Sequence, residues 1–304
     1  MRKTKSKNIR KNNVFIGIGA LVSLLFLLIA SSFMSSLFMS KADRINILVF
    51  GEKTFLYSID RKDSVHYAMY FYPDLKITVP KGYGFYRVGA LGKLAGLEHN
   101  PDIFRQAFSY STASFVPFYF YQNAKDVYYG GDQKMNLWLP GIKEILTYQS
   151  NTNFFDKIYL LGAFFTVKKA DIQYIAASNF SRKENDTSKF MTEDFTREFQ
   201  GFFYQAQYRR EMKSVQIIYD KHYNTAKALS NILEGSGIRV VDISEGKTTS
   251  TQCTITEEGS VFSQTATDLA YYFQCKLIKD KTAISDILFR LGSVEKGWEV
   301  SKQN

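Results

Sequence analysis

The sequence predicts a mixed α/β protein with an N-terminal apolar helix, an α/β sheet domain with flanking helices, and a small α+β domain. Three observations support this fold class. The 304 residues are 45% hydrophobic and 16% aromatic, a long apolar stretch lies near the start, and the last third alternates strand-like with helix-like segments. This hydrophobic content excludes a disordered chain, and aromatic side chains pack well on pleated sheets. We expect four regions, at residues 1–13, 14–39, 44–212 and 213–298.

Residues 1–13 and 14–39 have the pattern of a signal anchor. The first group carries six Lys or Arg and no acid, and the second carries no charge. An uncharged span of this length crosses a hydrocarbon core of ~30 Å, and the basic flank stays in the cytoplasm. A cleaved signal peptide is the alternative and would have a shorter apolar region. We therefore expect a basic cytoplasmic tail, one transmembrane helix, and a single-pass cell-membrane protein whose bulk is extracytoplasmic.

The net charge of +10 is concentrated in the N-terminal tail, which leaves about +4 for the rest of the chain. No basic stripe interleaved with stacking aromatic residues is present, so the sequence predicts no nucleic-acid partner. The basic tail is better suited to anionic lipid headgroups.

The two cysteines, Cys253 and Cys275, both lie in the C-terminal region. Outside the cytoplasm a disulfide is permitted. At the ends of neighbouring strands the pair would close a loop of about 22 residues, which stabilises by roughly 3 kcal/mol in the chain-entropy model. Two buried free thiols are the alternative, and we expect the disulfide.

Hydrophobic patterning predicts the elements of the larger region. Asn100 caps a helix whose first turn holds Pro101 and Asp102. The middle is less regular, with a strand or buried helix at 155–167 and a long loop with strand fragments at 168–195. Strands are expected at 44–51, 55–60, 65–72, 75–80 and 114–122, and helices at 86–98, 100–113, after Pro140, and at 194–212.

The C-terminal region has a clearer pattern, with the order β-α-β-β-α-β-β typical of a small α+β domain. Glycines at 235 and 237 end its first helix. Its strands are expected at 214–220, 238–244, 252–259, 275–280 and 285–292, and its helices at 224–237 and 261–274.

A candidate anion-binding site lies between the strands expected at 65–72 and 75–80 and the helix expected at 86–98. Asp74, Lys76 and Arg87 flank a turn that contains Gly82 and Gly84. Backbone N–H groups of such a turn can face an anion, and a guanidinium at its end can bind a phosphate bidentately. The alternative is a plain connection in which Arg87 is a surface or ion-paired residue.

No other motif predicts chemistry. The three histidines lack metal-ligand spacing, and the chain has no nucleophile elbow, P-loop or dinucleotide fingerprint. We therefore predict no catalytic residue, no metal site and no cofactor from the motifs themselves.

Several segments resemble the LytR–CpsA–Psr family of membrane-anchored cell-envelope proteins. They are INILVFG, YFYPDLKITVP followed by KGYG and FYRVGALGKL, and FVPFYFYQ; the segment 214–292, with VQIIYD and SDILFRLG, is similar to the LytR C-terminal domain. The resemblance implies a degenerate LytR–CpsA–Psr-like α/β domain at 44–212 and a LytR C-terminal-like domain at 213–298. Members transfer polyprenyl-pyrophosphate-linked glycopolymers to peptidoglycan, with Mg²⁺, acids and arginines around the pyrophosphate.

The chain departs from the family pattern at the positions that matter for transfer. Lys53 stands in the position of the Gly-x-Asp acid, and Pro73 in the position of the Pro-Arg-Asp arginine. Asp74 is kept, and Arg87 keeps only the cation of the Lys-Ile-Asn helix start. A pyrophosphate leaving group needs metal and guanidinium charge, so these losses predict a protein that does not transfer. Lys53 joins Asp74, Lys76 and Arg87 as a candidate ligand-binding residue.

Three functions follow as hypotheses. The first is a non-catalytic envelope protein that binds or scaffolds a polyprenyl-phosphate lipid or a cell-wall glycan. The second is a divergent active glycopolymer transferase, the only hypothesis that requires Mg²⁺. The third is a structural partner of other envelope proteins.

Overall fold

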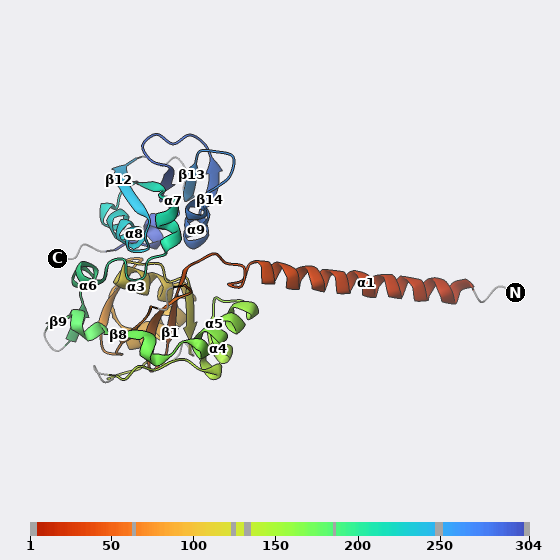
Figure 1. Ribbon diagram of the computed structural model, residues 1–304, viewed down its shortest axis with the longest axis horizontal. Helices are drawn as coiled ribbons and strands as arrows, with labels where there is room; N and C mark the ends of the chain where they lie inside the picture. The colour runs from red at the N-terminus through yellow and green to blue at the C-terminus, as the bar shows by residue number, and fades with distance from the viewer. Residues whose placement is uncertain are drawn as a thin grey trace.

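The computed structural model of the chain is a mixed α/β structure with three sheets (Figure 1). It describes residues 5–62, 65–122, 126–130, 135–184, 187–246 and 252–300, and for residues 5–17 the backbone alone.

The largest sheet has six strands in the order β7-β6-β1-β2-β3-β8. Strands β1 and β3 are buried along their whole length, which explains their near-continuous apolar sequences. The strands are β1 (Arg44–Phe50), β2 (Thr54–Asp60), β3 (His66–Phe71), β6 (Phe118–Tyr121), β7 (Gln149–Ser150) and β8 (Ile172–Ala176).

A second sheet has four strands in the order β5-β4-β10-β9. These strands are β4 (Lys76–Val79), β5 (Gly84–Arg87), β9 (Ser181–Glu184) and β10 (Thr187–Phe190). The helices of this region are η1 (Val88–Ala90), α2 (Leu91–Leu97), α3 (Asp102–Thr112), α4 (Ile142–Thr147), α5 (Phe154–Thr166), η2 (Lys169–Asp171), η3 (Ala177–Phe180), α6 (Thr192–Phe199) and α7 (Ala206–Glu211).

The third sheet has five strands in the order β12-β11-β15-β13-β14. Cys253 and Cys275 are disulfide-bonded just before β13 and β14, which confirms the predicted pairing. The elements are β11 (Ser214–Tyr219), α8 (Tyr223–Gly235), β12 (Arg239–Glu245), β13 (Thr254–Glu257), α9 (Gln264–Phe273), β14 (Lys276–Lys279), β15 (Ile287–Arg290) and α10 (Ser293–Gly297).

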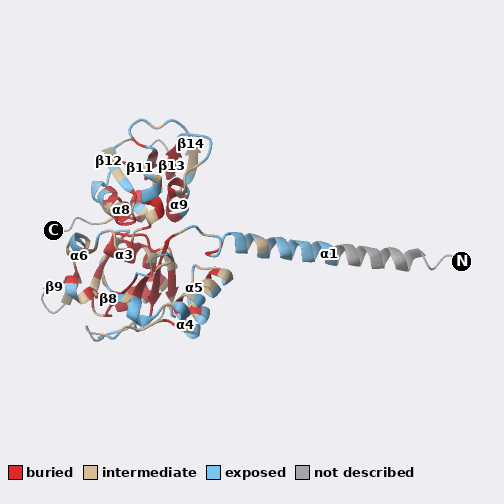
Figure 2. Ribbon diagram, in the orientation of Figure 1, coloured by how far each residue is buried: buried red, intermediate tan, exposed pale blue. Residues whose placement is uncertain are grey.

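Two hydrophobic cores lie inside these layers, as the buried residues in Figure 2 show. The first fills the space around the six-stranded and four-stranded sheets, and the second packs on the five-stranded sheet. Phe115 and Tyr208, which precede residue 213, belong to the second core. Arg105 and Ser109 of α3 hydrogen-bond to Tyr272 of the second core, so the two regions pack against each other. The domain boundary at 212/213 stays a prediction.

Helix α1 (Lys5–Met34) stands away from the folded part (Figure 1). Most of its large apolar side chains from Ile18 to Met34 are exposed (Figure 2). In the part of the chain that the structure describes, no helix has both the length and the apolar character needed to cross a membrane. The side chains of the predicted tail 1–13, and of the first residues of the predicted span 14–39, lie outside the described residues.

Three elements differ from the sequence expectations. Residues 86 and 87, expected as the start of a helix, belong instead to strand β5, because residues 84–87 pair with β4. The expected helix at 194–212 is two helices, α6 and α7, with a break that contains Gly201 at a φ of 87°. Residues 293–297 form α10, a short helix that the apolar pattern did not predict.

Candidate functional site

The candidate residues lie at one edge of the six-stranded sheet. Strands β1, β3, β6 and β8 run in the same direction, so their carboxyl ends meet there. Asp74 follows β3, and Lys53 lies in the turn between β1 and β2. In α/β sheets, ligands bind in crevices at this edge.

Asp74 and Arg87 form an ion pair, with 3.8 Å between Oδ1 and Nη1 and both side chains 44% exposed. The other carboxylate oxygen of Asp74, Oδ2, accepts a hydrogen bond from the N–H of Gly130 at 2.9 Å. An ion pair this long leaves most guanidinium donors of Arg87 unused. Arg87 therefore keeps the capacity to bind an anion.

Lys76 and Arg87 belong to a row of four cations across the second sheet, which we call the basic row. Arg87 pairs in register with Lys76, Lys76 with Lys189, and Lys189 with Arg182. Residues directly opposite each other on paired strands project from the same face and lie close together. All four side chains are exposed or partly exposed. The fold thus collects on one face cations from four strands.

The two central lysines of the basic row lack acidic partners among the described residues. Arg87 pairs with Asp74, and Arg182 pairs with Asp194 at 2.9 Å. Lys189 instead places its ammonium 3.7 Å from the ring centroid of Phe85. Like charges placed directly opposite each other on a sheet are destabilising. The row is therefore an electrostatic cost to the fold, of the kind found where a surface serves a ligand.

The segment 126–130 crosses the edge of the large sheet beside Asp74. The N–H of Tyr128 donates to the carbonyl of Gly89 at 3.0 Å, and the N–H of Gly89 donates to the carbonyl of Pro73 at 2.8 Å. A Cβ at Gly89 would lie 2.1 Å from the carbonyl oxygen of Tyr128, so only glycine fits. Burial raises the pKa of Tyr128 to about 12, and the nearby Asp126 adds to the effect. The phenol therefore stays neutral and takes part as a packing and hydrogen-bonding group.

Aromatic side chains fill the space beneath this segment. The ring of Phe50, at the end of β1, lies 4.6 Å from the ring of Phe104 and 6.0 Å from the ring of Tyr128. A Cβ at Gly92 would lie 3.0 Å from Phe50. This end of β1 is closed by side chains of the protein itself.

The glycine turn is also engaged by another part of the chain. Gly82 and Gly84 adopt φ values of 77° and 75°, which side chains rarely tolerate. The N–H of Gly82 donates to the carbonyl of Glu299 at 3.0 Å rather than facing open space. The N–H of Gly82 is therefore not available to an anion, and of the groups expected here only the cationic side chains remain for that role.

Lys53 is exposed at the same edge of the sheet, since the neighbouring Thr54 pairs with Phe71 at the end of β3. Within the described residues, no ion pair joins Lys53 to Asp74. The structure thus brings together Asp74, Arg87 and Lys76, and leaves Lys53 separate. In the same described part, no cluster of three or more His, Cys, Asp or Glu is arranged to hold a metal ion.

Sequence reasoning missed Lys189 and Arg182. Both lie in a stretch, SRKENDTSKF, whose strands were expected only as fragments of a loop. Residues 184–189 are all polar, so no alternation of polar and apolar residues marked a strand there. Nothing local indicated that this strand pairs with β4, so the basic row became visible only in the fold.

Comparison with known proteins gives matches among solved structures only. No family model matches the chain, and no curated protein matches its sequence. The LytR-CPS2A-psr family protein YwtF (TagT) with bound octaprenyl pyrophosphate lipid matches at 11% identity and a TM-score of 0.35, covering 51% of this chain and 87% of that one. The B. subtilis TagT structure matches at 13% identity and a TM-score of 0.36, with the same coverage. TagT bound to LIIa-WTA matches at 10% identity and a TM-score of 0.35, over 51% of this chain and 88% of that one.

These structures belong to the family that the sequence motifs resemble. At such identities and TM-scores, neither an activity nor a ligand nor a residue role transfers to this chain.

Proposed function

We propose that the chain is a membrane-anchored, extracytoplasmic protein of the cell envelope that binds a polyprenyl-linked phosphate component without transferring it. The basic row is the observation that carries the binding part of this proposal. It offers four cations on one face, two of which have no acidic partner in the described part of the chain. A polyanionic ligand would remove the repulsion between Lys76 and Lys189, which are in register on neighbouring strands.

The anchor is supported by the N-terminal pattern and by α1. Residues 14–39 carry no charge and follow a basic tail. The exposed apolar side chains of α1 are costly in water, by about 25 cal/mol for each Å² of apolar surface, and a bilayer removes that cost. The Cys253–Cys275 disulfide suits an oxidising compartment outside the cytoplasm.

The contacts of the Asp74 carboxylate support the absence of transfer activity. Its carboxylate holds Gly130 and Arg87, both from the chain itself, and Lys53 stands where the family has an acid. The polyprenyl ligand is proposed from the resemblance of the sequence motifs to the family. For this chain, that class of ligand is the one that an anchored protein with a basic surface would meet at the membrane.

The test is a titration of the detergent-solubilised full chain with polyprenyl phosphate, with and without Mg²⁺. We expect saturable binding that weakens by about tenfold for each lysine lost in Lys76→Gln/Lys189→Gln, since charge-assisted contacts contribute about 1.5 kcal/mol each. Lys169→Gln/Lys281→Gln removes two exposed lysines elsewhere and serves as the matched control. Equal binding by all three proteins, or none by the wild type, would reject the basic row as the site.

One observation favours a second function, divergent glycopolymer transfer. The Oδ1 atom of Asp74 is shielded from solvent and accepts no hydrogen bond from the described residues. A carboxylate oxygen in that state can accept a donor from a substrate. Binding that requires Mg²⁺, together with release of polyprenyl phosphate from a linked glycopolymer, would establish this function instead.

A further inference from the structure

A second basic site lies where α1 joins the folded part of the chain. A cavity of about 840 Å³ opens there between the connection from α1 to β1, the turn after β2, helix α7 and the start of α9. This volume is within the range of roughly 300–1,000 Å³ that is usual for small-ligand sites. Its lining residues are Ser40, Lys41, Ala42, Arg61, Lys62, Gln207, Arg210, Glu211, Phe262, Ser263 and Gln264.

Cations dominate the walls of the cavity. Lys62 and Arg210 are both ion-paired with Asp43, a buried residue behind the wall, and the Arg210 contact is 2.7 Å long. Both cationic side chains remain 58% exposed. The contact with Asp43 uses one guanidinium N–H of Arg210, which leaves donors for a ligand. Lys41 makes no ion pair with any described residue.

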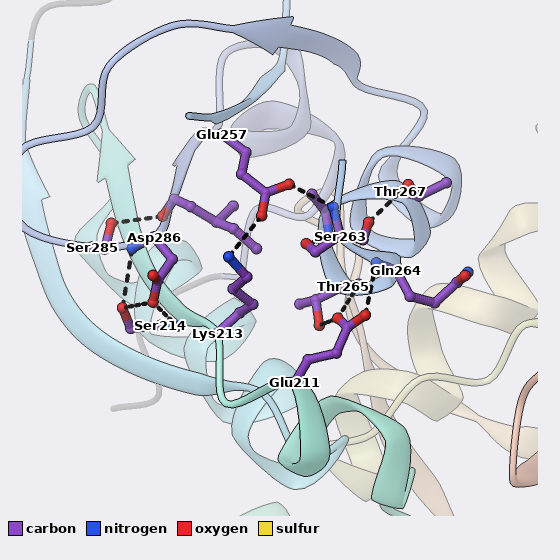
Figure 3. A network of polar contacts seen from close by, with 12 residues as sticks. Glu211, Lys213, Ser214, Glu257, Ser263, Gln264, Thr265, Thr267, Ser285 and Asp286 are labelled. Atoms are coloured by element: carbon purple, nitrogen blue, oxygen red, sulfur yellow. Dashed lines mark hydrogen bonds and ion pairs between the residues drawn. The ribbon is translucent and has the colours of Figure 1, made fainter. Parts of the chain in front are cut away.

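The acid in the lining, Glu211, has its carboxylate hydrogen-bonded by the protein itself (Figure 3). Its carboxylate accepts bonds from the N–H of Gln264 at 2.9 Å, and from the N–H and hydroxyl of Thr265 at 2.8 and 2.6 Å. Burial acts to raise the pKa of Glu211, but these hydrogen bonds outweigh it and lower the pKa below its ordinary value. Glu211 therefore stays charged and stabilises the start of α9. Against its one negative charge the lining carries four cations, Lys41, Arg61, Lys62 and Arg210, so the cavity remains basic.

Arg61 fixes the geometry of the wall. Its guanidinium donates to the carbonyls of Ser40 at 2.8 Å and Ala42 at 3.0 Å, and lies 5.0 Å from the ring centroid of Tyr159 on α5. The connection that carries Lys41 is thereby held against the body of the protein. The cavity is a formed site and does not depend on a free loop.

The cavity also lies next to the apolar surface of α1. Helix α1 ends at Met34, only a few residues before Ser40, and Leu37 between them donates its N–H to Asp156 of α5 at 2.7 Å. Exposed apolar side chains continue from α1 onto α5, at Phe154 and Phe165. A surface of this kind, apolar beside basic, matches the boundary between acyl chains and headgroups.

We propose that this cavity binds the phosphate of an anionic phospholipid headgroup at the membrane surface from which α1 emerges. This proposal rests on the proposed anchoring of α1. Lys41, Lys62 and Arg210 contact the phosphate oxygens, and Phe262 contacts the apolar part of the glycerol. The site is separate from the basic row, which uses other strands and another sheet.

The experiment is native mass spectrometry of the full chain released from nanodiscs of equimolar phosphatidylglycerol and phosphatidylcholine. We expect one phosphatidylglycerol retained per chain in preference to phosphatidylcholine. Lys41→Gln should reduce its retention about fivefold, and Lys41→Gln/Arg210→Gln about 25-fold, since each cation near an anionic surface contributes about a factor of five. Arg239→Gln/Lys281→Gln, which changes one exposed Arg and one exposed Lys elsewhere, should retain the lipid as the wild type does.

The single variant protects the test against misfolding, because Lys41 has no ion pair in the described part to lose. Unchanged retention in Lys41→Gln and in the double variant would overturn the proposal. Displacement of the lipid by added glycerol phosphate at equal concentration would also overturn it, since the site would then serve a soluble phosphate. Vesicle flotation tests the anchor and the lipid site separately. A chain that floats with vesicles but shows no lipid preference refutes the lipid site alone. A chain that does not float refutes the anchor.

Discussion

Charged residues serve opposite purposes in the C-terminal core and on the surface of the four-stranded sheet. In the C-terminal core they are buried acids with full sets of partners: Glu295 accepts three backbone N–H bonds, from Asp220, Lys221 and His222 at 2.5–2.7 Å. Glu257 similarly holds the N–H of Ser263 and the ammonium of Lys213 (Figure 3). In the N-terminal region, the basic row consists of partly exposed cations with too few acids around them.

The difference separates charges that stabilise the fold from charges left available to a ligand. A buried carboxylate with three donors is costly to remove, because the donors are then unsatisfied. Two lysines opposite each other on paired strands repel and lower the stability of the free protein, and a bound anion removes that repulsion. Removing a buried acid from the C-terminal core should therefore lower stability. Removing a lysine from the basic row should raise stability and weaken ligand binding.

The largest expected effect is at Glu295. Glu295→Ala removes the buried, charged acceptor of three part-buried backbone N–H groups and should lower the free energy of unfolding by about 3 kcal/mol. The measurement is urea unfolding of the detergent-solubilised full chain. Glu258→Ala, at an exposed position at the other end of the same sheet, should change the free energy by less than about 0.5 kcal/mol. Equal effects of the two variants would show that the hydrogen bonds of Glu295 contribute nothing.

The next effect is at Gly89, beneath the segment 126–130. Gly89→Ala forces a Cβ against the carbonyl of Tyr128 and should cost about 2 kcal/mol, with faster proteolysis of that segment. The control is Gly162→Ala in α5, where a Cβ meets nothing within 4 Å. Ala is the better helix former, so Gly162→Ala should stabilise by about 0.5 kcal/mol. A harmless Gly89→Ala would mean that the segment does not close over the sheet edge.

The same contrast shows how far the sequence alone could predict the structure. The C-terminal strands, its two main helices and the Cys253–Cys275 bond follow from local patterns: alternation, glycine stops and short connections. The basic row does not, because Lys76 and Lys189 meet through a strand pair more than a hundred residues apart in the chain. Asp74 and Arg87 were predicted together since both flank one hairpin. The contact of segment 126–130 with Gly89 depends on tertiary packing, and its only sign in the sequence is the glycine itself.

A smaller effect on the free energy of unfolding is expected at low pH. Burial acts to raise the pKa of Glu295, but the N–H bonds from Asp220, Lys221 and His222 outweigh it, so the folded pKa lies below its ordinary value of 4.5. The carboxylate therefore contributes stability above pH 4.5, and this contribution is lost as the pH falls through the lower folded value. The difference in unfolding free energy between wild type and Glu295→Gln should be constant above pH 4.5 and shrink below it. A difference that grows on acidification would contradict the assignment.

The smallest effect on stability is expected in the basic row, and its sign is opposite. Lys189→Gln removes one of two like charges in register and should stabilise the free protein by about 0.5 kcal/mol. Lys183→Gln, on the neighbouring strand but outside the row, should leave the free energy unchanged. The measurement is urea unfolding at low salt, and added salt should abolish the gain. A loss of stability in Lys189→Gln would show that Lys189 acts mainly through its contact with Phe85.

The most direct measurement is the unfolding free energy of wild type and Lys189→Gln with and without saturating polyprenyl phosphate. Ligand that binds only the folded state stabilises it in proportion to the logarithm of its affinity. The basic row as a ligand site predicts that Lys189→Gln is the more stable protein without ligand and gains less from it than the wild type. Equal gains from the ligand in both proteins would contradict the assignment of the basic row to ligand binding.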